Sequence, residues 1–109
     1  MPKSSLFING VRHHIDSWVK EDFDHNIYKV NFQIWSNDHS AKPKSFTTRL
    51  SREFIEDEID NDLNKDYVEQ VAHEMIRFHI VEILAFSGGR TSQNIKRWMV
   101  EAKNRLKNK

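Results

Sequence analysis

Apolar and polar residues alternate along the first half of the chain, a pattern that predicts β-strands. The clearest run is NIYKVNFQIW, in which the residues at positions 28, 30, 32 and 34 form one apolar face. We therefore predict a half-buried strand over residues 27–35. The segment SFTTRL repeats the two-residue spacing with Phe46, Thr48 and Leu50, which predicts another strand over residues 45–50.

The sequence SLFINGVRHHI predicts a β-hairpin near the N-terminus. Asn9-Gly10 is typical of a two-residue type I′ turn, whose residues both need positive φ angles. Short apolar segments flank the turn, so we expect strands over residues 4–8 and 11–15. We interpret residues 16–26 as a polar connection between this hairpin and the following strand.

Helical spacing begins after residue 51. Ser51 has the side chain of a helix N-cap, and the spacing of Ile55, Ile59 and Leu63 predicts one buried stripe. Residues 67–86 contain no Gly or Pro and predict a long central helix, and a last helix is expected from Thr91 to about residue 106. Four strands followed by three helices predict an α+β fold, an antiparallel four-stranded sheet with the three helices packed on one face.

Length and composition are consistent with a single α+β domain over residues 1–109, in which 107–109 form a frayed basic tail. Hydrophobic residues make up 38% of the chain, enough for a packed core. There is no cysteine, which excludes disulfides and thiolate chemistry. No apolar run is long enough to span a membrane, and the N-terminal residues lack the apolar core of a secretory signal. We expect a cytoplasmic protein without a membrane partner.

The net charge of +1 conceals an acidic middle and a basic end. Residues 91–109 carry six basic side chains against one acidic one, whereas residues 1–90 carry eleven basic and fifteen acidic ones. The candidate acidic partner surface consists of Glu53, Glu56, Asp57, Glu58, Asp60 and Asp62. Such a cluster either marks a surface for a partner or is neutralised by the basic segment of the same chain.

The basic end offers a candidate nucleic-acid contact. The last predicted helix alternates an apolar seam with four cations, Lys96, Arg97, Lys103 and Arg105. A basic outer face on a helix is typical of phosphate contacts, so nucleic-acid binding is the alternative to protein binding. Lys and Arg also complement the dipole at the C-terminal end of any helix, which is the structural alternative.

The stretch AFSGGRTSQ, residues 85–93, contains two adjacent glycines and three hydroxyl side chains. It resembles the Ser-Gly-Gly-x-x-Ser pyrophosphate loop of the adenine-nucleotide-hydrolysing superfamily, and the resemblance implies a phosphate held by Ser87, Gly88 and Gly89 with Thr91 and Ser92. In that family the loop follows the first strand of a parallel sheet, and most of the domain lies downstream. Here it follows a predicted helix, and only 17 residues come after Ser92.

We therefore interpret the two glycines as the end of the central helix. Gly88 can adopt the left-handed conformation that terminates a helix, and Thr91 or Ser92 can cap the next one. The remaining functional alternative is smaller. Arg90, beside the free amides of a helix N-terminus, is a candidate contact for a phosphate or carboxylate.

His79 and Glu82 form a candidate buried polar pair in the central helix. They lie three residues apart on its apolar face and can therefore touch. A buried His with a carboxylate is either an acid–base pair or a satisfied structural hydrogen bond. No nucleophile or third ligand accompanies them in the pattern, which favours the structural interpretation.

The sequence contains no complete metal or cofactor motif, so we expect neither a metal nor a cofactor. AHEMIRFH lacks the second His at position 77 that a zinc-protease helix needs. His13 and His14 are neighbours on a strand and point to opposite faces, so they cannot chelate one ion.

These patterns favour a small non-enzymatic protein-interaction or regulatory module, and an enzyme is the alternative left open. A composition rich in Asn, Lys and Ile is typical of AT-rich bacterial or phage genes, which favours an adaptor or inhibitor. The C-terminal half of the central helix is apolar nearly all round. It must be enclosed by the last helix or by a second copy, and the latter predicts a homodimer.

Overall fold

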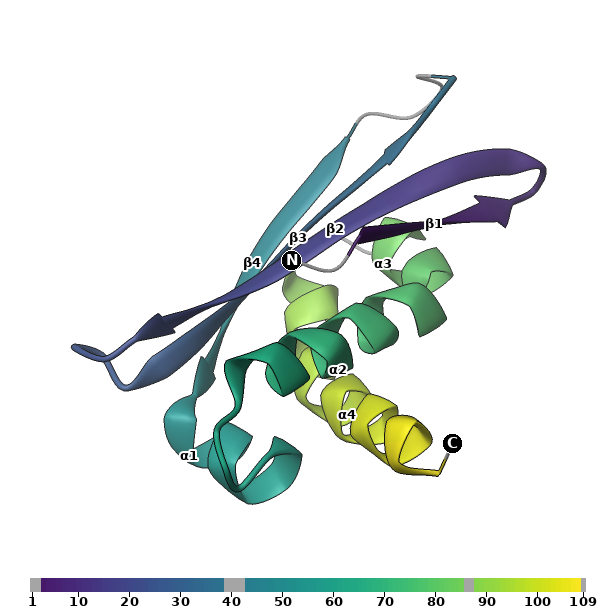
Figure 1. Cartoon of the computed structure of the whole chain (residues 1–109). Helices are drawn as coiled ribbons and strands as arrows, with labels where there is room; N and C mark the ends of the chain where they lie inside the picture. Colours follow the sequence, from purple (N-terminus) through teal and green to yellow (C-terminus); the bar gives the residue numbers. More distant parts are fainter. Residues whose placement is uncertain (1–2, 39–42, 86–87, 109) are drawn as a thin grey trace.

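The fold is a four-stranded sheet covered on one side by helices (Figure 1). The computed structural model describes residues 3–38, 43–85 and 88–108, with the backbone alone for 88–92. Strands β1 (Lys3–Ile8), β2 (Val11–Asp22), β3 (Ile27–Ser36) and β4 (Lys44–Ser51) form an antiparallel sheet in the order β1-β2-β3-β4. They are followed by α1 (Arg52–Phe54), the π-helix η1 (Ile55–Ile59), α2 (Lys65–Phe78), α3 (Ile80–Ala85) and α4 (Gly88–Lys107). The predicted α+β fold is confirmed.

The first hairpin forms as the sequence indicates. Asn9 and Gly10 have φ angles of 51° and 80°, which is the positive-φ pair of a type I′ turn. The register of β1 on β2 runs from Ile8 opposite Val11 to Lys3 opposite Asp16. Beyond Asp16, β2 has no described strand neighbour on its β1 side.

Strand β2 is much longer than predicted, and the interpretation of residues 16–26 as a polar connection is wrong. The strand continues to Asp22 and pairs with β3 as far as Asp22 opposite Ile27. Its charged residues misled the prediction because only one face of this segment is buried. Ser17 and Val19 are each 1% exposed, whereas the alternate residues Trp18 and Lys20 point to the other face.

The core lies between the helices and one face of the sheet. The even-numbered residues of β3 from Tyr28 to Ile34 are buried there, opposite Ile15 and Val19 of β2. Helices α2 and α4 supply the other wall with Val68, Val71, Ala72, Met75, Ile76, Ile95, Trp98, Met99 and Ala102. Because side chains of a strand alternate, the odd-numbered residues of β3 point away from every helix.

The first helical segment begins where the sequence predicts and ends early. The Ser51 hydroxyl accepts a hydrogen bond from the Phe54 N–H at 3.1 Å, which confirms the predicted N-cap. The chain then widens to a π-turn, closed by the bond from Asp60 N–H to the Ile55 carbonyl at 2.8 Å. Asn64 caps α2, and its side chain accepts from the Asp66 N–H.

The long central helix predicted over residues 67–86 is two helices. His79 has φ −106° and ψ 22°, outside the helical region, and it separates α2 from α3. This bend places Ile80 and Ile83 in the core. The last helix begins at Gly88, so the predicted start at Thr91 is wrong, and Gly88 and Gly89 belong to its first turn.

The polar residues of α2 are partly covered by the sheet. Glu69 is 8% exposed and His73 is half-buried, because both face β2. Phe78, the last residue of the helix, is by contrast 61% exposed. The helix lies between β2 and α4, so its buried surface is wider than a single stripe.

Candidate functional site

The face of the sheet that no described helix covers carries two half-buried indole rings. Trp18 lies on β2 opposite Asn31, and Trp35 lies on β3 opposite His14. The imidazole of His14 stacks on Trp35 with centroids 5.4 Å apart, and His14 Nε2 lies 2.6 Å from the Asn37 side-chain oxygen. We call this surface, made of the outward residues of all four strands, the open face.

Three cations lie in one row across the open face. Lys20 of β2 is opposite Lys29 of β3, which is opposite Arg49 of β4. Like charges directly opposite one another on a sheet repel. Lys29 has partial compensation from Asp22, whose carboxylate is 3.8 Å from Nζ. Among the described residues, neither Lys20 nor Arg49 forms an ion pair.

The rows between the cations and Trp35 are neutral apart from Asp16 and its β1 partner Lys3. Trp18, Asn31 and Thr47 form one row, and the Thr47 hydroxyl donates to Asn31 Oδ1 at 2.6 Å. A depression of about 300 Å³ opens beside Trp18, lined also by Gln33, Ser45 and Thr47. A second one of about 310 Å³ opens beside Trp35, lined by Lys3, Ser5, His14 and Asp16 among others.

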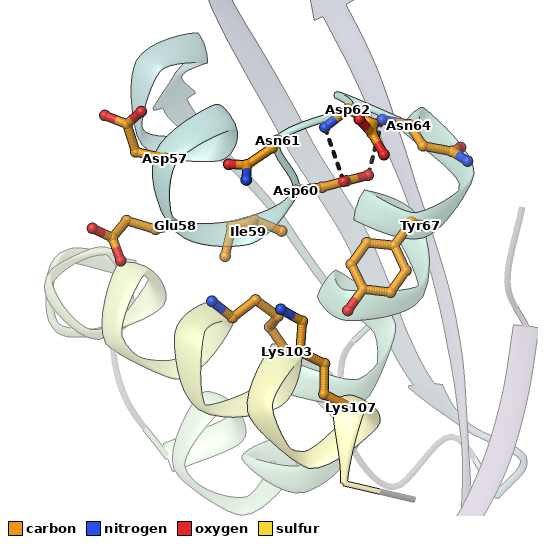
Figure 2. Close-up of a pocket in the computed structure, with 10 residues that line it drawn as sticks. All are labelled: Asp57, Glu58, Ile59, Asp60, Asn61, Asp62, Asn64, Tyr67, Lys103 and Lys107. Carbon is orange, nitrogen blue, oxygen red and sulfur yellow. Dashed lines mark hydrogen bonds between the residues drawn. The ribbon is translucent and has the colours of Figure 1, made fainter.

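The predicted acidic surface and the basic end of the chain face one another across a hollow of about 630 Å³. Asp57, Glu58, Asp60 and Asp62 line one wall, and Lys103 and Lys107 rise from α4 toward them (Figure 2). The tertiary structure thus places the two charged segments side by side. This arrangement favours mutual compensation within the chain over a free acidic partner surface.

Asp60 has a structural role in the wall of this hollow. Its carboxylate accepts from the N–H groups of Asp62 at 3.1 Å and Asn64 at 3.0 Å, and so it fixes the turn that leads into α2 (Figure 2). Burial and the nearby Asp60 charge raise the pKa of Tyr67, which lines the same hollow. The phenol is therefore neutral and available as a hydrogen-bond donor. Glu53 and Glu56 lie outside the lining and are exposed.

Three of the four cations predicted to contact nucleic acid make contacts within the protein. Lys96 lies over the Phe54 ring, and Arg97 donates to Asn94 at 2.7 Å. Arg105 packs over Phe78, with its Nε 3.5 Å from a Glu74 oxygen. Lys103 borders the acidic hollow. Helix α4 therefore presents no continuous row of uncommitted cations among the described side chains, and its contact with nucleic acid stays a prediction.

His79 and Glu82 do touch, and a second carboxylate joins them. His79 Nδ1 lies 3.2 Å from a Glu82 oxygen, and its Nε2 lies 3.4 Å from a Glu101 oxygen on α4. The imidazole stacks on Trp98, with centroids 4.3 Å apart and an interplanar angle of 11°. His79 is 8% exposed and lines none of the four depressions noted on this molecule. This geometry favours the structural interpretation of the pair.

The glycine stretch of residues 85–93 is described only in part. Ser87 and the side chains of Arg90, Thr91 and Ser92 lie outside the described residues. The described backbone from Gly88 onward is helical, so Gly88 and Gly89 do not end the central helix as predicted, and Thr91 and Ser92 lie inside α4. The anion contact predicted for Arg90 stays a prediction.

A polar chain that the sequence did not indicate joins the sheet to α2. His73 Nε2 lies 2.7 Å from the Ser4 hydroxyl and its Nδ1 lies 2.8 Å from the Ser17 hydroxyl. Burial, followed by the charge of Arg77, lowers the pKa of His73, while Glu74 and Asp16 oppose the shift more weakly. A neutral imidazole donates at one nitrogen and accepts at the other, which suits two hydroxyl partners.

The described residues contain no group of three or more His, Asp and Glu side chains placed to hold a metal ion. None of the described helices is both long and apolar enough to cross a membrane.

The sequence analysis did not identify the open face, because Trp18 was assigned to a connection. The alternation of Ser17 and Val19 around Trp18 was a signal that could have placed it on a strand.

Neither protein-family models, nor curated proteins, nor solved structures gave a match to this chain, so its family is not assigned.

Proposed function

We propose that the protein is a small non-enzymatic binding and regulatory module that holds a macromolecular partner against the open face of its sheet. The observation that carries the proposal is the uncovered pair Trp18 and Trp35 beside the repelling row of cations. Half-exposed indoles supply large contact area at low cost in conformational entropy, which is why Trp is enriched where proteins bind partners.

The open face also violates a local rule of sheet stability. Lys20, Lys29 and Arg49 repel one another across adjacent strands, whereas opposite charges at these cross-strand positions would attract one another. Departures of this kind are expected at functional sites, where a partner supplies the missing complement. In the candidate catalytic pair of His79 and Glu82, by contrast, the imidazole is already stacked on Trp98.

Affinity capture from cell extracts with matched variants tests the proposal. The Trp18→Ala/Trp35→Ala double variant removes the two indoles, and Phe78→Ala removes an aromatic side chain, 61% exposed, at the end of α2. Both the proteins and the nucleic acids retained by each variant are identified. We expect at least one macromolecule to be retained by the wild type and by Phe78→Ala but lost from the double variant. Identical recovery from all three proteins would exclude the open face as the binding surface.

A further inference from the structure

The open face combines the features by which sheets bind single-stranded nucleic acid, and we propose that its partner is single-stranded RNA. This inference rests on the proposed function, since it names the partner of the same surface. Four-stranded sheets recognise unpaired RNA by stacking bases on outward aromatic side chains while basic groups hold the backbone.

The two indoles supply the stacking positions. Trp18 and Trp35 sit on neighbouring strands, and the cross-strand partner of Trp18 is Asn31, four residues before Trp35 on β3. At the usual rise of a strand this separates the two rows by about 14 Å. A depression opens beside each indole, and on Trp35 a base would stack on the ring face opposite His14 or displace the imidazole. A strand crossing the face can therefore stack bases at two separate places.

The row of cations supplies the phosphate contacts. Lys20, Lys29 and Arg49 lie directly beyond the Trp18 row, at the end of the sheet near the turn of residues 23–26. A phosphate between adjacent members of the row would replace repulsion by attraction. Lys3, opposite Asp16, adds positive charge beside Trp35, whereas Arg12 packs over the ring of Phe7. Asp16 and Asp22 are acidic side chains of this face, and Asp22 accepts bonds from His25. Glu21 and Asp24 line the depression beside Lys20 and Lys29, so phosphates meet the cation row on the side of Arg49.

The polar middle of the face favours RNA. Gln33, Ser45 and Thr47 are exposed and lie between the Trp18 and Trp35 rows or beside them. Amide and hydroxyl side chains both donate and accept, which suits base edges and the 2′-hydroxyl. A duplex presents no free base faces to the indoles, so an unpaired strand is the form that uses them.

Charge distribution also favours this face over the helical one. The acidic residues 53–62 belong to α1, η1 and the following turn, on the helix side of the sheet (Figure 1). A polyanion is repelled there and is attracted to the Lys20–Lys29–Arg49 row. Of the two sides of the sheet, the open face is therefore the one whose cations can attract a polyanion.

The direct test measures the binding of a fluorescein-labelled single-stranded RNA of about 12 nucleotides by anisotropy over a range of KCl concentrations. With three phosphate contacts the logarithm of affinity should fall with the logarithm of salt with a slope of roughly −2. Trp18→Ala should weaken binding about 10- to 100-fold, whereas Trp18→Phe should retain most of it because a ring remains to stack on.

Two charge-matched triple variants locate the contact. Lys20→Gln/Lys29→Gln/Arg49→Gln and Lys96→Gln/Arg97→Gln/Lys103→Gln remove the same charge from the open face and from α4. We expect the first to lose RNA binding and its salt dependence, and the second to keep both. The first variant should melt no lower than the wild type, because it removes repulsion. Folding of every variant is checked by circular dichroism.

Several results would overturn the assignment. They are absence of RNA binding by the wild type at low salt, loss of binding in the α4 triple variant alone, and equal affinity for DNA of the same sequence. Equal affinity for an acidic peptide would overturn it as well, in favour of a protein partner. If the wild type does not bind the labelled RNA but still captures a macromolecule from extracts through Trp18 and Trp35, the proposed function stands. Only the RNA partner is then refuted.

Discussion

The Glu69 carboxylate accepts a hydrogen bond from the backbone N–H of Val19, with 2.9 Å between Oε2 and N. Glu69 is 8% exposed, and Val19 lies beyond Asp16, where the described pairing of β1 with β2 ends. A helix side chain thus completes the hydrogen bonding of a strand edge inside the protein. Buried N–H groups are almost always paired, and here the partner comes from fifty residues downstream.

Removing this acceptor should destabilise the fold. We expect Glu69→Ala to lower the free energy of unfolding by about 1–3 kcal/mol, because the Val19 N–H is left buried and unpaired. Glu69→Gln keeps an acceptor oxygen and should cost less than Glu69→Ala. Urea denaturation followed by circular dichroism measures both. Equal stability of the two variants would show that the hydrogen bond contributes nothing.

Stability should fall in mild acid because of His73. The pKa of this imidazole is lowered in the folded protein by burial and by Arg77, so below about 6.5 the unfolded chain binds more protons than the folded one. The stabilisation is therefore complete above that pH and is lost as the pH falls through the lowered value. Denaturation midpoints at a series of pH values measure this slope.

His73→Gln is the matched variant for the pH series, since an amide can also bond two hydroxyls without titrating. This variant should flatten the dependence of stability on pH between about pH 6.5 and the lowered pKa of His73. Only the pH dependence that comes from carboxylates should remain. A wild-type profile that the substitution does not change would assign the acid sensitivity to other groups.

The stack of His79 on Trp98 should matter for stability and not for binding. His79→Ala removes a ring contact and a buried side chain, and we expect a loss of about 1–3 kcal/mol in the free energy of unfolding. His79→Phe keeps the ring but not the contacts to Glu82 and Glu101, and should lose less. RNA affinity of His79→Phe should equal that of the wild type. A large loss of affinity in a stable His79→Phe protein would point to a functional role for the pair.

The predicted homodimer should form through the bend between α2 and α3. Phe78 and Val81 are each 61% exposed there, the part of the predicted central helix from which the sequence suggested a homodimer. We expect light scattering to report a dimer that the Phe78→Ser/Val81→Ser variant converts to a monomer. A monomeric wild-type protein at high concentration would exclude this interface.

Local pattern was sufficient for the class of fold and for most element positions. The alternation in residues 27–35, the Asn9-Gly10 turn and the Ser51 cap all depend on short-range geometry, which the sequence displays directly. The same reasoning failed for β2 after residue 15, because polar residues on an uncovered face give a weaker pattern than residues in a core.

The candidate site depended on contacts between distant residues. The sequence singled out the cations of α4, yet the row formed by Lys20, Lys29 and Arg49 exists only through strand register. Likewise, the predicted pair His79–Glu82 gained its Trp98 and Glu101 neighbours from α4. Register and helix packing bring together residues whose spacing in the chain carries no periodic signal.

The sequence by itself determined that four strands precede the helices, because hydrophobic spacing and turn residues act over a few neighbours. Only the tertiary structure decided which face stays uncovered and which charges meet. Helices α2 and α4 shield one side of the sheet and bring Lys103 to the acidic hollow, while Lys20 and Arg49 remain outward on the other side. Electrostatic neighbours depend on distances in space, and packing of the apolar helix faces on the sheet sets those distances.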